Sequence, residues 1–130
     1  MIGFYGNIET LALKNENFRQ VIFTGKFAQL MLMSLLPGEQ IGFEEHQNVD
    51  QFFRIEQGEA SFVLNTGKEQ HLAKKGDAVI VPAGTSHNVI NASKTETVKL
   101  YTIYSPPNHP DKTMHQTKAG ADQAEVVTRR

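Results

Sequence analysis

Turn-forming residues recur along this chain at intervals that leave little room for long helices. Glycine-containing turn signals occur at LPGEQ, EQGEA, NTGKE, KKGDA and PAGTS. The segments between them are short, apolar or alternating, and rich in Val, Ile, Phe and Thr; they are residues 19–24, 27–35, 51–56, 60–64, 78–81, 88–90 and 97–104. Many short strands separated by turns are typical of a β-sandwich or β-barrel. We therefore expect an all-β fold.

Two local features refine this expectation. NTGKE, between Leu64 and His71, predicts a hairpin because Gly accepts a positive φ angle. Residues 10–17 are the one segment in which we expect a short helix.

The 130 residues fit one domain. We expect residues 1–104 to form a single barrel with N-terminal flanking strands.

The composition changes after Tyr104. Residues 105–130 are polar, hold three of the five prolines and show little strand pattern. We expect this segment to be a tail rather than a domain, either wrapped on the barrel or partly disordered, and dispensable for folding.

The charge balance and the absence of cysteine exclude several classes of function. Thirteen basic residues face 14 acidic ones, so no basic field is available for nucleic acid or an anionic membrane. Without cysteine, a bound metal must be held by nitrogen and oxygen ligands. The N-terminus lacks a basic start followed by a long apolar run, and FAQLMLMSLL is too short for a membrane span. We expect a cytoplasmic protein.

The stretch EEHQNVDQFF, residues 44–53, contains the first candidate site. Glu44 and His46 lie two residues apart, so in an extended segment their side chains point the same way. A carboxylate and an imidazole on one wall are plausible metal ligands. By itself the pair also fits a polar loop, since an exposed Glu-x-His is common.

A second stretch, GDAVIVPAGTSHNVIN at residues 76–91, has a more specific pattern. Gly76 and Gly84 suit turns at strand ends, and Pro82 fixes φ before the turn. His87 begins a strand, and Asn91 suits a bond to the backbone where that strand ends. The spacing of these residues resembles the second motif of the cupin superfamily at every position.

The first cupin motif then aligns with the opening stretch. In that family it reads Gly, five residues, His-x-His, three or four residues, Glu, six residues, Gly. Here Gly38 and Gly58 fix the frame, with Glu44 in place of the first His, His46 retained, and Gln51 in place of the Glu. The chain thus resembles a small single-domain bacterial cupin, which implies a double-stranded β-helix, or jelly-roll barrel.

Strand parity decides between Gln51 and its acidic neighbour Asp50. Residues 51, 53 and 55 share one face of QFFRIE, and residues 52, 54 and 56 share the other. The face with Ile55 and without Arg54 is the better inner face. Gln51 is therefore expected to point inward and Asp50 outward.

The resemblance implies a metal centre formed by Glu44, His46, Gln51 and His87. Two imidazoles, one carboxylate and one amide oxygen suit Fe, Mn, Co, Ni or Zn. Since only Glu44 carries charge, a divalent ion would keep a net charge of about +1, which favours an anionic or chelating ligand. The alternative is a cupin pocket without metal, in which Glu44 and Gln51 bind a ligand through hydrogen bonds.

The positions of the remaining histidines are predicted from the segments in which they lie. His71 follows the hairpin turn and is expected to face solvent. His109 and His115 lie in the tail, which resembles the C-terminal segment of a subgroup of small bacterial cupins, and a folded-back tail would bring one of them to the mouth of the pocket. The apolar run FAQLMLMSL predicts sandwich core or a dimer face, and we expect a homodimer.

The resemblance also limits the functions to be considered. Cupins include sugar-phosphate and uronate isomerases, dioxygenases that cleave diketones or flavonols, and decarboxylases. The first hypothesis is a metal-dependent isomerase, lyase or dioxygenase acting on a small oxygenated substrate that chelates the ion. The second is a non-catalytic sensor or small-molecule-binding module, and the third is a structural dimer with a vestigial site. The sequence names neither the metal nor the substrate, because the fold does not choose among them.

Overall fold

The structure, a computed structural model, describes residues 2–128. Two helices flank nine strands in this part of the chain. In chain order the elements are α1 (Ile8–Lys14), β1 (Arg19–Thr24), β2 (Gln29–Leu35), β3 (Asp50–Gln57), β4 (Glu59–Leu64), β5 (Glu69–Lys74), β6 (Ala78–Val81), β7 (His87–Ile90), β8 (Val98–Ser105), β9 (Met114–His115) and α2 (Lys118–Thr128).

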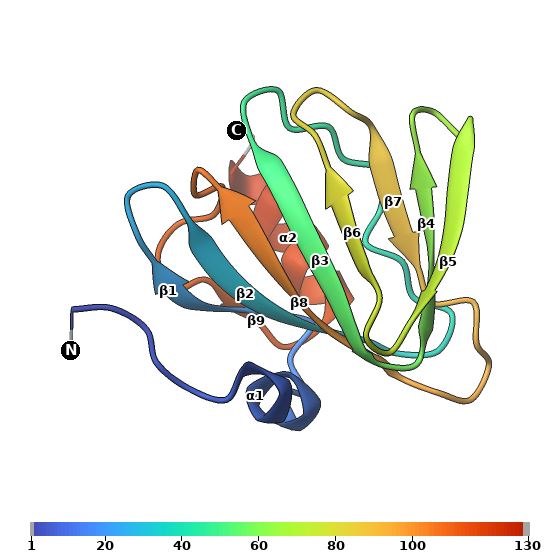
Figure 1. Cartoon of the computed structure of the whole chain (residues 1–130), viewed down its shortest axis with the longest axis horizontal. Helices are drawn as coiled ribbons and strands as arrows, with labels where there is room; N and C mark the ends of the chain where they lie inside the picture. Colours follow the sequence, from blue (N-terminus) through green and yellow to red (C-terminus); the bar gives the residue numbers. More distant parts are fainter. Residues whose placement is uncertain (1, 129–130) are drawn as a thin grey trace.

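The strands form two antiparallel sheets that face each other (Figure 1). The larger has the order β6-β3-β8-β2-β1-β9, and the smaller has the order β5-β4-β7. The inward side chains of both sheets form one apolar core that includes Phe53, Ile55, Phe62 and Leu100. The predicted all-β jelly-roll fold is confirmed, and each predicted strand is present within one or two residues of its expected bounds.

The inner face of β3 follows the predicted parity. Gln51, Phe53 and Ile55 are buried, whereas Phe52 and Arg54 are half-buried on the other face. Beyond Ile55 the register against β8 shifts, and Glu56 is buried as well. The alternation therefore holds where it matters for the site, at the N-terminal half of the strand.

Helix α1 covers the outer face of the larger sheet. It begins after Asn7, whose side chain accepts a hydrogen bond from the Thr10 N–H, and it begins two residues earlier and ends three residues earlier than predicted. Together with Leu30, Leu32 and Tyr101 it forms a second apolar cluster. The helix thus accounts for the apolar outer face of β2 within one chain, and the homodimer stays a prediction.

The segment after Ser105 folds back onto the barrel and contains β9 and α2. Gln29, fully buried on β2, holds it in place: its Oε1 accepts hydrogen bonds from the N–H groups of Asn108 and His109 at 3.0 and 2.9 Å, and its Nε2 donates to the His109 carbonyl at 2.8 Å. Strand β9 pairs with the start of β1. These contacts argue against the expectation that the segment is dispensable for folding, because truncation would remove both hydrogen bonds that the Gln29 amide oxygen accepts and leave its Nε2 with Thr24 Oγ1 alone.

None of the helices within residues 2–128 is long and apolar enough to cross a membrane.

Candidate metal centre

The two sequence motifs meet through their backbones at one end of the barrel. Glu44, in the connection between β2 and β3, forms an isolated antiparallel bridge with His87, the first residue of β7. Each N–H of this pair donates to the other's carbonyl at 2.9 Å. The Gly84 N–H donates to the His46 carbonyl at 2.8 Å from a turn with φ of +81°, which Gly adopts without strain. The backbone therefore fixes the three side-chain positions relative to one another.

The side chains of Glu44, His46 and His87 converge. One potential ligand atom from each lies within 4.8 Å of the others. His46 Nε2 and Glu44 Oε2 are 4.0 Å apart, too far for a hydrogen bond, and the two imidazole centroids are 5.4 Å apart. Donor atoms on opposite sides of a first-row metal ion lie about 4.2 Å apart, twice a bond of roughly 2.1 Å. The cluster thus has the size of a coordination shell.

Buried polar atoms without partners give an independent test of whether these residues suit a metal. Among the residues that the structure describes, His46 Nε2, His87 Nε2 and Gln51 Oε1 are buried and lack a hydrogen-bond partner. Buried polar atoms of folded proteins are almost always paired, and each unpaired one costs about 1–3 kcal/mol. A cation held between Glu44, His46 and His87 would satisfy the two imidazole nitrogens, so this set of three residues fits a metal ion.

The orientation of His87 is set by a second hydrogen bond. Its Nδ1 lies 3.1 Å from the Thr85 carbonyl, which can only accept, so Nδ1 carries the proton and the Nε2 lone pair is free. A backbone carbonyl in this position is a common outer partner of metal-bound histidines.

Gln51 is buried on the inner face of β3. Its Nε2 donates to Thr102 Oγ1 at 3.0 Å, which leaves the carbonyl oxygen as the unpaired end of the amide. Asp50 points away, is exposed and accepts from the Ala83 N–H at 2.8 Å. Asp50 therefore has a structural role at a turn, whereas Gln51 as a fourth ligand stays a prediction.

Burial places the three converging groups in protonation states suited to metal binding. It raises the pKa of Glu44 to about 6, with the positive charge of Arg19 opposing the rise. It lowers the pKa of His87, and it lowers the pKa of His46 with help from the neighbouring imidazole. At pH 7 the carboxyl group is therefore ionised and both imidazoles are neutral.

A pocket of about 640 Å³ opens in front of this cluster. Glu44 and His46 form part of its floor, and His109 and His115 from the C-terminal segment line it as well. Its remaining lining residues are Arg19, Ile41, Gly42, Phe43, Glu45, Asn108, Pro110, Thr113, Lys118, Asp122, Ala124 and Glu125.

Two groups of this region escaped the sequence prediction. Tyr104, buried at the end of β8, lies edge-on to His46 and is 3.1 Å from His109 Nε2 through its hydroxyl oxygen. Burial holds the pKa of Tyr104 above its usual value and lowers that of His109 to about 3, so both groups are neutral at pH 7 and share one hydrogen bond. Arg19 is buried at the start of β1. Arg19 and the buried Val21 are two residues apart on β1, so their side chains point to the same face. This alternation is the sequence signal that could have placed Arg19 inside the barrel.

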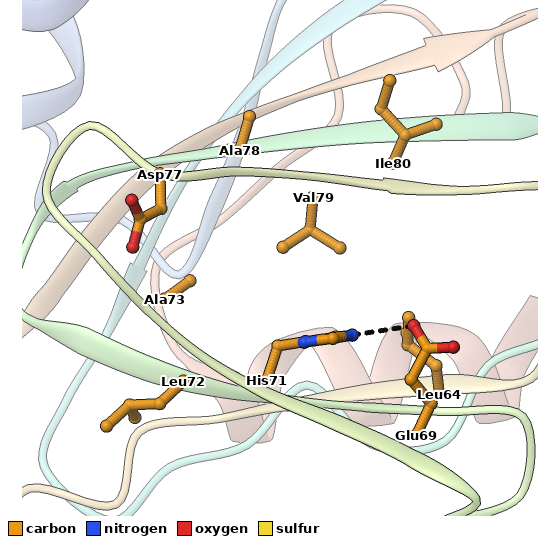
Figure 2. A pocket seen from close by; sticks show the side chains of 9 residues that line it. All are labelled: Leu64, Glu69, His71, Leu72, Ala73, Asp77, Ala78, Val79 and Ile80. Atoms are coloured by element: carbon orange, nitrogen blue, oxygen red, sulfur yellow. Dashed lines mark hydrogen bonds and ion pairs between the residues drawn. The ribbon is translucent and has the colours of Figure 1, made fainter.

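A second groove, of about 440 Å³, lies between the edge strands β5 and β6 (Figure 2). It contains His71, which is exposed as predicted and pairs with Glu69 at 2.7 Å. In Figure 2 the other lining residues are mostly Ala, Val, Leu and Ile from the two strands. Within the described residues the groove holds no third metal-ligating group close to this pair.

The fold and the site define a β-barrel with a small-molecule-sized pocket at one end and a His- and carboxylate-lined cluster at its base. Residues 31–104 match the family model described as Cupin domain. The chain therefore belongs to the cupin family.

The chain is also similar to individual proteins. It is 49% identical over 126 residues to the uncharacterized protein YrkC of Bacillus subtilis, covering 94% of this chain and 67% of that protein. It is 47% identical over 105 residues to the uncharacterized protein L612 of Acanthamoeba polyphaga mimivirus, covering 80% and 66%. The chain thus spans about two thirds of the length of these relatives.

Among solved structures, BH2720 from Bacillus halodurans superimposes with a TM-score of 0.89 at 40% identity. The superposition covers 92% of this chain and 93% of that one. KdgF from Halomonas sp. shares the fold with a TM-score of 0.61 at 21% identity, covering 69% and 78%.

Proposed function

We propose that this protein is a metal-dependent enzyme acting on a small oxygenated molecule. The observation that carries the proposal is the convergence of unpaired, buried His46 Nε2 and His87 Nε2 beside the Glu44 carboxylate, together with a pocket of about 640 Å³ that Glu44 and His46 line. Glu44, His46 and His87 would hold a divalent Fe, Mn, Co, Ni or Zn ion, with Gln51 Oε1 as the fourth protein ligand. Such an ion supplies a Lewis acid for a coordinated substrate oxygen.

The surrounding residues provide the other requirements of a reaction. Buried Phe53 packs edge-on to His87 and helps to keep water from the base of the cluster. Gln51 cannot accept a proton, so a base must come from elsewhere. His109 lines the pocket and is hydrogen-bonded to Tyr104, but a pKa of about 3 makes its imidazole a weak base at neutral pH, so we assign it to hydrogen bonding with the substrate rather than to proton abstraction.

These assignments limit the substrate and the reaction to a few chemical classes. A sugar acid, a sugar phosphate or a diketone would offer the two oxygens that chelation requires, and the enzyme would be an isomerase, a lyase or a dioxygenase. The proposed setting is the cytoplasm, and the proposed assembly is a homodimer, which sedimentation at micromolar concentration would test.

The decisive experiment is metal analysis of natively purified protein, followed by aerobic and anaerobic screens of sugar acids and diketones. Stoichiometric metal together with turnover supports the proposal. Oxygen consumption separates a dioxygenase from an isomerase. Protein that contains no metal and is insensitive to chelators contradicts it.

The alternative is a non-catalytic sensor or binding module that uses the same pocket. The observation in its favour is Gln51, since an amide in this position binds a ligand without supplying charge or accepting a proton. Tight ligand binding without turnover would support this alternative.

A further inference from the structure

Arg19 is a buried charge whose hydrogen bonding is incomplete. Its residue exposure is 3%, it lines the pocket in front of the metal cluster, and its Nε has no hydrogen-bond partner among residues 2–128. The one ion pair of its guanidinium in the described structure is with Glu125, where Nη1 and Oε1 are 3.6 Å apart, longer than a hydrogen bond. Burying a charge that is poorly paired costs several kcal/mol, so such an arrangement points to a missing partner.

The charge of Arg19 acts on the same pocket as the metal cluster. It opposes the protonation of His46, His109 and His115 and lowers the pKa of Glu44 against the effect of burial. Arg19 also lines the same pocket as Glu44, His46 and His109, so a ligand bound there would lie within reach of its charge.

The acidic residues around the pocket leave Arg19 available, with one exception. Asp122 is paired with Lys118, and exposed Glu45 accepts a hydrogen bond from Gln47 at 2.6 Å. Glu125, whose side chain is 45% exposed, is thus the one described carboxylate that forms an ion pair with the guanidinium. The Glu44 carboxylate also interacts with the charge of Arg19, but in the proposed function it binds the metal ion.

We propose that Arg19 is the anion-binding residue of the pocket and that the ligand carries a carboxylate, which displaces Glu125. The planar guanidinium fork matches a carboxylate through two parallel hydrogen bonds. Among the described residues that line the pocket, Lys118 is paired with Asp122, so Arg19 is the cationic group with the weakest pairing. A single guanidinium matches a singly charged carboxylate better than a doubly charged phosphate. This inference narrows the proposed function, on which it rests, to an organic acid.

The test compares probes of one shape and different charge. Glycolate and glycolamide both offer a hydroxyl and a carbonyl oxygen, but only glycolate is anionic; inorganic phosphate tests the other anion. Binding is followed by protein NMR chemical shifts in Zn²⁺-loaded and in chelator-treated protein, with the metal content of each sample measured separately. Failure of metal loading then counts against the proposed function, whereas the preference among probes in either form reports on Arg19.

We expect wild-type protein to prefer glycolate over glycolamide by about tenfold or more, since hydrogen bonds between two charged groups are stronger than those to a neutral amide. Arg19→Gln should abolish the preference, and Arg19→Lys should retain part of it. Lys118→Gln is the matched control for a positive charge at the same pocket and should leave the preference within about twofold. Glu125→Gln, a change at a half-exposed side chain, should strengthen glycolate binding several-fold.

The outcomes separate cleanly. Equal affinities for glycolate and glycolamide, an unchanged preference in Arg19→Gln, or unchanged glycolate binding in Glu125→Gln would overturn the inference. Tighter binding of phosphate than of glycolate would overturn the assignment to a carboxylate. If Arg19→Gln does not fold, Glu125→Gln together with the probe preference of the wild type decides.

Discussion

Two Glu-x-His tripeptides in this chain have the same spacing but lie in different environments. At residues 44–46 the carboxylate and imidazole are 18% and 15% exposed and 4.0 Å apart, turned toward His87. At residues 69–71 they are 56% and 54% exposed and bind each other directly at 2.7 Å. The first pair sits at the base of a pocket, and the second lies in the open groove of Figure 2.

The comparison shows that the Glu-x-His spacing by itself does not make a metal site. In solvent a carboxylate and an imidazole satisfy each other, and such a surface pair contributes at most about 1 kcal/mol. At residues 44–46 the carboxylate and the imidazole are largely buried beside His87 and are held apart. Their electron pairs are then available to bind a cation. The following predictions test this contrast, from the largest expected effect to the smallest.

The first prediction compares His87→Ala with His71→Ala. Metal at 100 times its dissociation constant adds about 2.7 kcal/mol to the free energy of unfolding, which raises the Tm by on the order of 10 °C for a domain of this size. His87→Ala removes one ligand and should abolish this rise, whereas His71→Ala should retain it. Thermal unfolding with metal and with chelator measures both. A metal-induced rise that survives in His87→Ala would contradict the assignment.

The second prediction concerns the pH dependence of the metal-free protein. Because the pKa of Glu44 is about 6 in the folded state against 4.5 for the free group, the folded chain binds more protons between these values. Its contribution to stability is therefore present below pH 4.5 and is lost as the pH rises through about 6. The 1.5-unit difference corresponds to about 2 kcal/mol.

Urea unfolding of wild-type protein and Glu44→Gln across pH 4–7 checks this value. The histidines titrate in both proteins, so the difference between the two profiles isolates Glu44. Glu69→Gln is the matched control and should follow the wild-type profile. A profile of Glu44→Gln that coincides with wild type would show that Glu44 is not the titrating group.

The third prediction is that Gln51→Glu retains metal. The substitution restores a carboxylate at the position where the cupin motif has one, so the affinity for metal should stay equal or rise, by up to about tenfold. The net charge at the ion falls by one, and turnover of an anionic substrate should drop. Chelator competition and metal analysis measure the affinity. Loss of metal in this variant would contradict the assignment of residue 51 as a ligand position that accepts a carboxylate.

The fourth prediction is the absence of an effect. Gln70→Glu converts residues 69–71 into Glu-Glu-His, the same tripeptide as residues 44–46. Stability should change by less than about 0.5 kcal/mol, since Gln70 is exposed on β5. In a His87→Ala background the variant should bind no metal. Metal bound by that double variant would mean that the tripeptide alone suffices.

Strand parity and turn chemistry accounted for much of the fold and for part of the site. The alternation within β3 correctly placed Gln51 and Phe53 inside and Asp50 outside. The glycine and proline positions predicted the turn before His87, and Asn91 bonds to the Leu35 and Glu96 carbonyls at a strand end as expected. These properties depend on a residue and its near neighbours, so a single sequence carries them.

The sequence by itself determined which residues face inward and which spacing links the two motifs. The tertiary structure alone decided that Glu44 pairs with His87 through the backbone, that α1 covers the outer face of β2, and that Gln29 holds the C-terminal segment against the barrel. It also decided that Arg19 lines the same pocket as Glu44 and His46 rather than lying only in a core strand. The physical reason is that side-chain alternation is local, whereas the meeting of distant segments depends on packing and hydrogen bonding summed over the whole chain.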